Sequence, residues 1–352
     1  MKALVKTKDM PGLEYVNIEK PVPKSNEVLI EIEASSICGT DRHYYNWNQI
    51  AKDIGSKFHI TFTFVIGHEC SGTIIEVGSS VINRKVGQRV AIETHIPCGN
   101  CFECQNGKIH NCENMKIYGT SCNGCFSQYT TVDANVTFVL PDEISFEEGA
   151  LMEPAGVAMR AVEESRINFS DTVVVNGCGS IGLMIIQILQ ASSAGCVIAV
   201  DLDEYRLKLA EDFGAIPVNI KKQDVVKVVR DLTLNHRGAD VVIEVSGASN
   251  AFKNLFEMTR PEGRIITVGH PNDMVLIDIM KSINLKGISL KGIFGRHIWD
   301  TWWSLTSLIV TKKINLLDVV THRFPYSMYK EAFEQTEKGA GKILFIKDEK
   351  DG

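Results

Sequence analysis

Four cysteines lie within one stretch of fifteen residues. They are Cys98, Cys101, Cys104 and Cys112, out of ten cysteines in the chain. Four thiolates from one loop form the ligand set of a closed tetrahedral zinc site, which leaves no position for water or substrate. Four buried thiols without metal are the alternative, but packing alone rarely produces such spacing. We therefore expect a structural zinc that stabilises a loop with little core of its own.

A second set of possible metal ligands is spread along the chain. Cys38 stands in Ile-Cys-Gly-Thr-Asp, His68 and Glu69 are adjacent, and Glu153 precedes a proline. Thiolate, imidazole and carboxylate all suit Zn²⁺, and a mixed set with a labile carboxylate can admit water or a substrate oxygen. Each residue alone is more often an ordinary buried or capping residue. The set is a hypothesis for a catalytic zinc, and spacing does not show that its members converge.

A glycine motif, G-x-G-x-x-G, is formed by Gly177, Gly179 and Gly182. It follows the β-like run Thr172 to Val175 and opens a helix, so backbone amides at the helix N-terminus can face a pyrophosphate. Asp201 lies 19 residues beyond the last glycine, where a carboxylate binds an adenosine ribose and repels a 2′-phosphate. We expect NAD rather than NADP, although the nearby Arg206 reduces that preference. A turn needed only for packing is the alternative.

These residues belong to two regions that differ in their pattern of predicted strands and helices. Up to about Ala150 the chain has short β-like runs such as Glu27 to Ile32. From about Pro154 strands and helices alternate, which predicts a doubly wound parallel sheet. We expect an α/β protein with a Rossmann domain at 155–290 and a β-rich domain made of 1–154 and 291–352. The apolar segment Val173 to Val200 fits strand, helix and strand better than a membrane span.

The composition of the chain restricts the classes of molecule that it can bind. The formal net charge of −6 argues against nucleic acid, because phosphate binding needs a surplus of Lys and Arg on one face. The beginning Met1 to Lys6 is too short and too charged for the apolar core of a signal peptide. We expect a cytoplasmic protein that acts on a small molecule, with neither nucleic acid nor membrane as a partner.

Taken together, the Gly67-His68-Glu69 motif followed by Gly72, the four-cysteine loop, Glu153-Pro154 and the glycine motif with its Asp resemble zinc-containing medium-chain dehydrogenases. The resemblance extends over essentially the whole chain and implies that the β-rich domain is GroES-like. Four separate segments resemble one branch of this family more closely, the threonine-oxidising branch. They are Cys38 to Trp47, Glu93 to Gly99, Gly295 to Trp302 and Thr321 to Phe324.

The resemblance implies a role for each site residue. Cys38, His68 and Glu69 would hold the catalytic zinc, with Glu153 as a nearby carboxylate able to bind or release it. Thr40 and His43 would pass the proton outward, and His95 would sit beside the substrate. The residues that would hold NAD are Gly177, Gly179, Ile181, Gly182, Asp201, Arg206, Val268, Gly269, His270, Ile293 and Phe294.

The expected reaction is oxidation of L-threonine by NAD⁺ to 2-amino-3-oxobutanoate, with two Zn²⁺ per chain and a homotetrameric assembly. Two departures bear on the substrate. Val157 stands where that branch has asparagine, and Glu153 stands where the alcohol dehydrogenase branch usually has a cysteine ligand. A polyol or sugar dehydrogenase is the nearest alternative. A redox sensor that binds NAD without catalysis is more distant, since a sensor needs no open metal position.

Several residues also have purely structural explanations. His43 could be a surface histidine, and His95 could pack a loop beside the structural zinc. The near-helical spacing of Trp299, Trp302 and Trp303 favours core or subunit packing. Cys122 and Cys125 form another C-x-x-C, but no helix N-terminus precedes them to lower a thiol pKa, so we expect no redox role.

Overall fold

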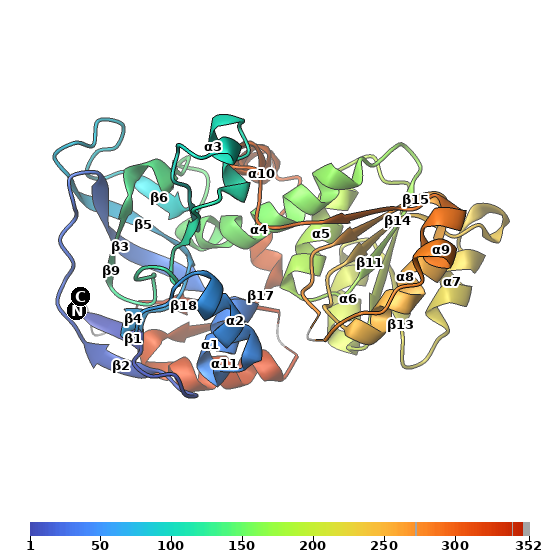
Figure 1. The fold of residues 1–352 in the computed structure, drawn as a ribbon, viewed down its shortest axis with the longest axis horizontal. Coiled ribbons are helices and arrows are strands. Elements are labelled where there is room, and N and C mark those ends of the chain that lie inside the picture. The colour runs from blue at the N-terminus through green and yellow to red at the C-terminus, as the bar shows by residue number, and fades with distance from the viewer. Residues whose placement is uncertain (272, 340, 348–352) are drawn as a thin grey trace. The chain divides into compact units, whose positions relative to one another are not determined.

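The computed structural model describes residues 1–271, 273–339 and 341–347, and it divides the chain into two compact units (Figure 1). The first unit contains Met1–Pro154, His297–Val310 and the chain from Leu316 onward. The second contains Ala155–Arg296 and Thr311–Asn315. Helix α4 (Phe146–Ser165) includes the point of division, and Pro154, which lacks a backbone N–H, lies inside it.

A seven-stranded sheet forms the centre of the first unit. Its strand order is β10-β6-β5-β3-β18-β17, and β9 also pairs with β3. The long strand β3 directs Val28, Ile30 and Ile32 into the core, and Leu29 on its other face is buried as well. The strands are β3 (Glu27–Ser36), β5 (Glu69–Val77), β6 (Arg89–Ile92), β9 (Tyr129–Asp133), β10 (Thr137–Val139), β17 (Val320–Pro325) and β18 (Lys342–Ile346).

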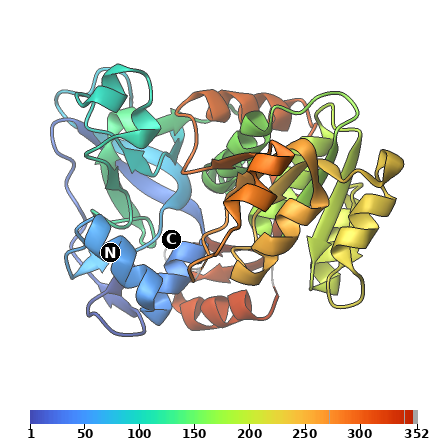
Figure 2. The ribbon, with the colours of Figure 1, turned by 45° about the vertical axis from the view of Figure 1, so that its right-hand side comes forward.

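Smaller elements complete this unit. Strands β1 (Lys2–Lys6), β2 (Glu14–Asn17) and β4 (Phe64–Val65) form one sheet, and β7 (His95–Ile96) pairs with β8 (Lys116–Ile117). Helix α11 lies beside α1 in both views (Figures 1 and 2). The helices are α1 (Gly39–Asn46), α2 (Gln49–Lys57), α3 (Phe102–Gln105), α10 (Asp300–Val310) and α11 (Tyr329–Glu337). The sequence analysis did not anticipate α1 and α2, which are short and only partly buried.

The second unit is the expected doubly wound parallel sheet, with order β13-β12-β11-β14-β15-β16 and helices on both faces (Figure 2). Because both faces are covered, the inner strands are continuous apolar runs. The strands are β11 (Thr172–Asn176), β12 (Cys196–Asp201), β13 (Ile216–Asn219), β14 (Ala239–Glu244), β15 (Thr259–Thr267) and β16 (Ser289–Gly292). The helices are α5 (Ser180–Gln190), α6 (Glu204–Asp212), α7 (Val225–Asp231), α8 (Phe252–Met258) and α9 (Ile279–Ser282).

The strand order reverses between β11 and β14, the position at which open α/β sheets bind ligands. The apolar segment Val173 to Val200 is β11, α5 and β12, as expected. Within the described ranges, no helix is long and apolar enough to cross a membrane.

A buried carboxylate anchors the amino-terminal side of this sheet and yields a stability prediction. Asp240 receives hydrogen bonds from Arg260 at 2.6 Å and from the backbone N–H of Thr172 at 2.8 Å. Burial alone would raise the pKa of Asp240, but these hydrogen bonds and the Arg237 charge outweigh it and lower the pKa. Its stabilisation is therefore present above the ordinary Asp pKa of about 3.9 and is lost as pH falls through the lowered value.

Asp240→Asn should reduce the free energy of unfolding by about 2 kcal/mol near neutral pH. The difference from the unchanged chain should stay constant down to about pH 4 and shrink below it. Urea unfolding followed by circular dichroism at several pH values measures this, with the exposed Asp212→Asn as control. A constant difference at all pH values would contradict the assignment of the effect to the Asp240 charge.

Candidate active site and cofactor site

Cys38, His68 and Glu69 converge, as the catalytic-zinc hypothesis requires. Their ligand atoms all lie within 4.8 Å of one another. Register explains the convergence: Ser36 at the end of β3 pairs with Glu69 at the start of β5, which brings Cys38, the N-cap of α1, across from His68. The pairing of two strands thus assembles residues that lie far apart in the sequence.

The surroundings of His68 fit a metal ligand. Its Nδ1 lies 3.6 Å from Asp41 Oδ1, and both side chains are buried. Burial alone would lower the pKa of His68, but the Asp41 and Cys38 charges outweigh it and raise the pKa well above its usual value. Burial raises the pKa of Asp41 to about 6. A carboxylate behind an imidazole orients a histidine ligand, so the donor set and its support both suit zinc.

Glu69 is held by a buried cation that the sequence analysis missed. Lys342 Nζ lies 2.5 Å from Glu69 Oε2 and donates to the backbone oxygen of Ile37 at 3.0 Å. The Ser36 hydroxyl donates to the same carboxylate. Burial alone would lower the pKa of Lys342, but Glu69 outweighs it and raises the pKa. The available signal was a lysine at the start of an otherwise apolar terminal strand.

Thr40 lies next to this group and His43 lies on the same helix. The distance between Thr40 Oγ1 and Cys38 Sγ is 3.9 Å. His43 comes three residues after Thr40, so the two share one face of α1. The Asn48 amide donates to His43 Nδ1 at 2.8 Å. This geometry places Thr40 beside a metal ligand, and both Thr40 and His43 are half-buried.

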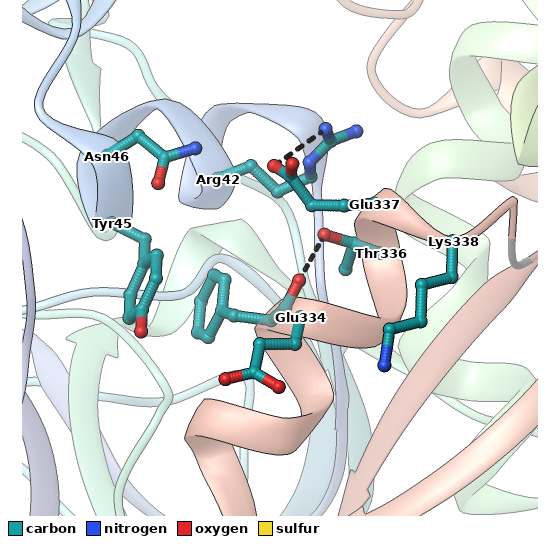
Figure 3. Close-up of a pocket in the computed structure, with 8 residues that line it drawn as sticks. Arg42, Tyr45, Asn46, Glu334, Thr336, Glu337 and Lys338 are labelled. Carbon is teal, nitrogen blue, oxygen red and sulfur yellow. Dashed lines mark hydrogen bonds and ion pairs between the residues drawn. The ribbon is translucent and has the colours of Figure 1, made fainter.

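Helix α1 is fixed to α11 from the far end of the chain. The Tyr45 ring stacks on Phe333 at 4.5 Å between centroids, and Arg42 pairs with Glu337 at 3.3 Å. Figure 3 shows Arg42, Tyr45 and Glu337 around a surface hollow of about 350 Å³, which Phe333 also lines. These contacts hold the helix that carries Thr40 and His43.

Glu153 lies near the three ligands without joining them. Its charge raises the pKa values of His68 and Lys342, yet among the described residues it is not part of the group within 4.8 Å. The Thr94 hydroxyl donates to Glu153 Oε1 at 2.7 Å.

The structure places His95 against another buried carboxylate. His95 Nδ1 lies 3.0 Å from Glu93 Oε1, and the Trp302 indole N–H donates to Glu93 Oε2 at 2.8 Å. Trp302 is fully buried, whereas the Trp303 side chain is 62% exposed. Core packing therefore explains Trp302, and the role of His95 beside the substrate stays a prediction.

The four-cysteine loop forms the second convergent group, since its sulfur atoms all lie within 4.8 Å of one another. The backbone N–H of Asn100 is the main cause that lowers the pKa of Cys98 to about 6. Burial raises the pKa of Cys104 to about 12. Cys122 and Cys125 lie outside the group, and burial raises both their pKa values. Burial thus makes these two thiols less acidic, and the absence of a redox role stays a prediction.

The glycine motif forms a cradle at the carboxyl end of β11. Gly177 has a φ of 107°, a left-handed conformation that favours glycine. A Cβ on Gly182 would lie 1.9 Å from the Gly177 backbone oxygen, so helix α5 approaches the strand only with glycine there. By contrast, a Cβ on Gly179, the N-cap of α5, would meet nothing within 4 Å. Open space before a helix N-terminus fits a pyrophosphate. Ile181 follows in the first turn.

Asp201, at the end of β12, already holds the loop. Its Oδ2 accepts from the backbone N–H of Cys178 at 2.7 Å, and its Oδ1 accepts from Leu202 and Asp203 at 2.7 and 3.0 Å. A carboxylate oxygen accommodates two donors, so Oδ2 keeps capacity for a ribose hydroxyl. Arg206 lies one turn into the helix that follows, α6.

A network that sequence reasoning missed connects the remaining strands at this edge. Glu244, at the end of β14, accepts from the Asn176 amide, from Ser246 Oγ at 2.6 Å and from the Gly247 N–H at 2.8 Å. Burial raises the pKa of Glu244. Its backbone oxygen accepts from the N–H groups of Val268 and Gly269, which His270 follows. An acidic residue ending an apolar strand was the available signal.

Ile293 and Phe294 follow β16 at the same edge. The Ile293 N–H donates to the Thr267 backbone oxygen at 2.9 Å, and Arg160 donates to the backbone oxygen of Phe294. The residues expected to bind NAD are thus found at the carboxyl ends of four strands (β11, β12, β15 and β16), on α5 and on α6.

Comparisons with known proteins agree with this geometry. Residues 24–142 match the family model "Alcohol dehydrogenase GroES-like domain", and residues 180–311 match "Zinc-binding dehydrogenase". An L-threonine 3-dehydrogenase from Bacillus subtilis (strain 168) is 39% identical, with 98% of each chain covered.

Two solved structures are similar over the full length. The 2R,3R-butanediol dehydrogenase from Bacillus subtilis has a TM-score of 0.88 at 31% identity and covers 99% of each chain. A short chain alcohol dehydrogenase from E. coli CFT073, complexed with NADH, has a TM-score of 0.88 at 25% identity, covering 98% of this chain and 99% of that one. With 39% identity to a relative over nearly its whole length and both domain matches, this chain belongs to the zinc-binding, GroES-like family of medium-chain alcohol dehydrogenases.

Proposed function

We propose that this chain oxidises the β-hydroxyl of L-threonine with NAD⁺, giving 2-amino-3-oxobutanoate, NADH and a proton. The observation that carries the proposal is the convergence of Cys38, His68 and Glu69 in a chain 39% identical to an L-threonine 3-dehydrogenase over 98% of its length. A mixed set of three protein ligands suits a catalytic zinc, because such a site keeps a position for substrate.

We assign roles to the residues near this group from the family resemblance, and their positions support the assignment. Cys38, His68 and Glu69 would hold the metal. A zinc ion there supplies a Lewis acid that makes an alcohol hydroxyl more acidic. Thr40, beside Cys38, would relay the hydroxyl proton by taking it up while passing on its own, and His43 would deliver a proton to solvent. An imidazole suits this task because its ordinary pKa lies near neutral pH.

The Rossmann domain, which we place at 155–290, would bind the cofactor. The amides around Gly179 would receive the pyrophosphate, and Asp201 would bind the adenosine ribose and reject a 2′-phosphate. NAD⁺ supplies the hydride acceptor. The domain formed by 1–154 and 291–352 would supply the zinc sites and the substrate contacts, with His95 beside the substrate.

A second candidate is a dehydrogenase for a diol or polyol. The similarity to 2R,3R-butanediol dehydrogenase supports it, as does Val157, an apolar residue where the threonine-oxidising branch has asparagine. Both candidates oxidise a secondary alcohol, so substrate contacts alone separate them. A homotetramer in the cytoplasm stays a prediction, which size-exclusion chromatography with light scattering would test for the assembly.

The proposed function is tested by NADH formation with L-threonine, D-threonine, L-serine, 2,3-butanediol, sorbitol and xylitol. We expect L-threonine to have the highest kcat/KM, and Cys38→Ser to abolish turnover while the chain still binds NADH. A diol or polyol that exceeds L-threonine would favour the second candidate. NADH binding without oxidation of any alcohol would contradict both.

Zinc content provides a second prediction. The unchanged chain should contain about two zinc ions, and Cys112→Ser should lose about one because the closed site loses a ligand. The loop should then become sensitive to proteolysis. Elemental analysis measures the zinc, with Cys122→Ser, outside both groups, as control. Two zinc ions in the Cys112 variant would mean that this loop holds no metal.

The proton path provides a third prediction. His43→Ala should lower kcat about 100-fold because proton release loses its acceptor, while NADH affinity should stay nearly constant. Steady-state kinetics and NADH fluorescence titration measure the two effects. His59→Ala removes an exposed histidine and serves as control. An unchanged kcat in the His43 variant would remove this residue from the mechanism.

A further inference from the structure

Thr94 follows Glu93, whose buried carboxylate is bonded to Trp302, and lies beside the candidate metal ligands. Its side chain is nearly buried, and the hydroxyl lies 2.7 Å from Glu153 Oε1 and 3.3 Å from the backbone oxygen of His68. A hydroxyl has one proton to donate, so the short contact with the ionisable carboxylate is the hydrogen bond. The longer contact shows that this bond forms directly beside a metal ligand.

The backbone around Thr94 has little freedom. The Glu93 N–H donates to the Val136 oxygen at 2.8 Å, and the Tyr118 N–H donates to the Thr94 oxygen at 2.9 Å. The fully buried Glu93 carboxylate also binds the Trp302 indole and the His95 ring. The Glu93 carboxylate thus contacts Trp302 and His95, whereas the Thr94 hydroxyl contacts Glu153.

We propose that Thr94 is a positioning residue whose hydroxyl holds the Glu153 carboxylate next to the Cys38, His68 and Glu69 group but outside it. This inference rests on the proposed function. A carboxylate beside the metal competes with the alcohol for the remaining ligand position. By holding Glu153 back, Thr94 keeps that position open, and the anchored Glu93 segment keeps Thr94 in place.

Thr94→Val tests the proposal, because valine has nearly the shape of threonine without the hydroxyl. The probe is Co²⁺ in place of zinc, whose visible absorption reports the ligands. We expect the valine variant to shift this spectrum and to release metal to a chelator about tenfold more slowly, since Glu153 without this hydrogen bond can become a ligand. Thr94→Ala is the second variant should valine fold poorly.

Three further variants make the result specific. Thr94→Ser keeps the hydroxyl and should restore the spectrum and the release rate. In a Glu153→Ala background, Thr94→Val should have no further effect, because the carboxylate is absent. Thr130→Val removes another buried hydroxyl of the same unit, which donates to the Gly124 oxygen, and controls for lost stability. An unshifted spectrum in the valine variant, or the same shift without Glu153, would overturn the proposal.

Kinetics separate this proposal from the proposed function. Thr94→Val should raise the KM for the alcohol about tenfold, with a smaller effect on kcat and NADH affinity unchanged. The cobalt and chelator measurements need no substrate, so they judge Thr94 by themselves. A chain that shows the expected spectra but oxidises no alcohol would contradict the proposed function alone.

Discussion

The first unit depends on a buried ion pair between strands from opposite ends of the chain. Glu69 of β5 and Lys342 of β18 face each other beside Ser36 of β3, the strand that separates them in the sheet. Removing one partner of such a pair leaves an uncompensated charge and costs about 3–5 kcal/mol. The same carboxylate belongs to the candidate zinc ligands. The pairing of the terminal strand and the geometry of the metal group therefore depend on the same side chain, Glu69.

Local patterns predicted much of the second unit. Its strands are apolar runs, its glycine turn opens a helix, and Asp201 ends the next strand, so each signal lies within a few residues of the structure it describes. Gly177 and Gly182 illustrate this, since their conformation and close packing explain the glycines directly. The fold class was predictable for the same reason.

The candidate active site was predictable only in part. The metal-ligand types of Cys38 and His68 were visible in the sequence, but their proximity came from a family resemblance, because strand register is a long-range property. The supporting residues were missed altogether. Lys342, Glu93 and Glu244 are charged residues in or beside apolar strands, and nothing local indicates which buried group they bind. Such partners are defined by tertiary structure.

Asp201 combines two tasks in one side chain. Besides its expected contact with a ribose, its carboxylate accepts the N–H of Cys178 inside the glycine loop. A substitution of Asp201 that admits a 2′-phosphate would remove the negative charge. It would also remove the acceptor of the Cys178 N–H, which supports the loop that receives the pyrophosphate. Cofactor choice and loop geometry are thus coupled in this chain. An evolutionary change of cofactor would need a compensating donor or acceptor near Cys178, which makes NAD preference harder to lose than a single surface contact would be.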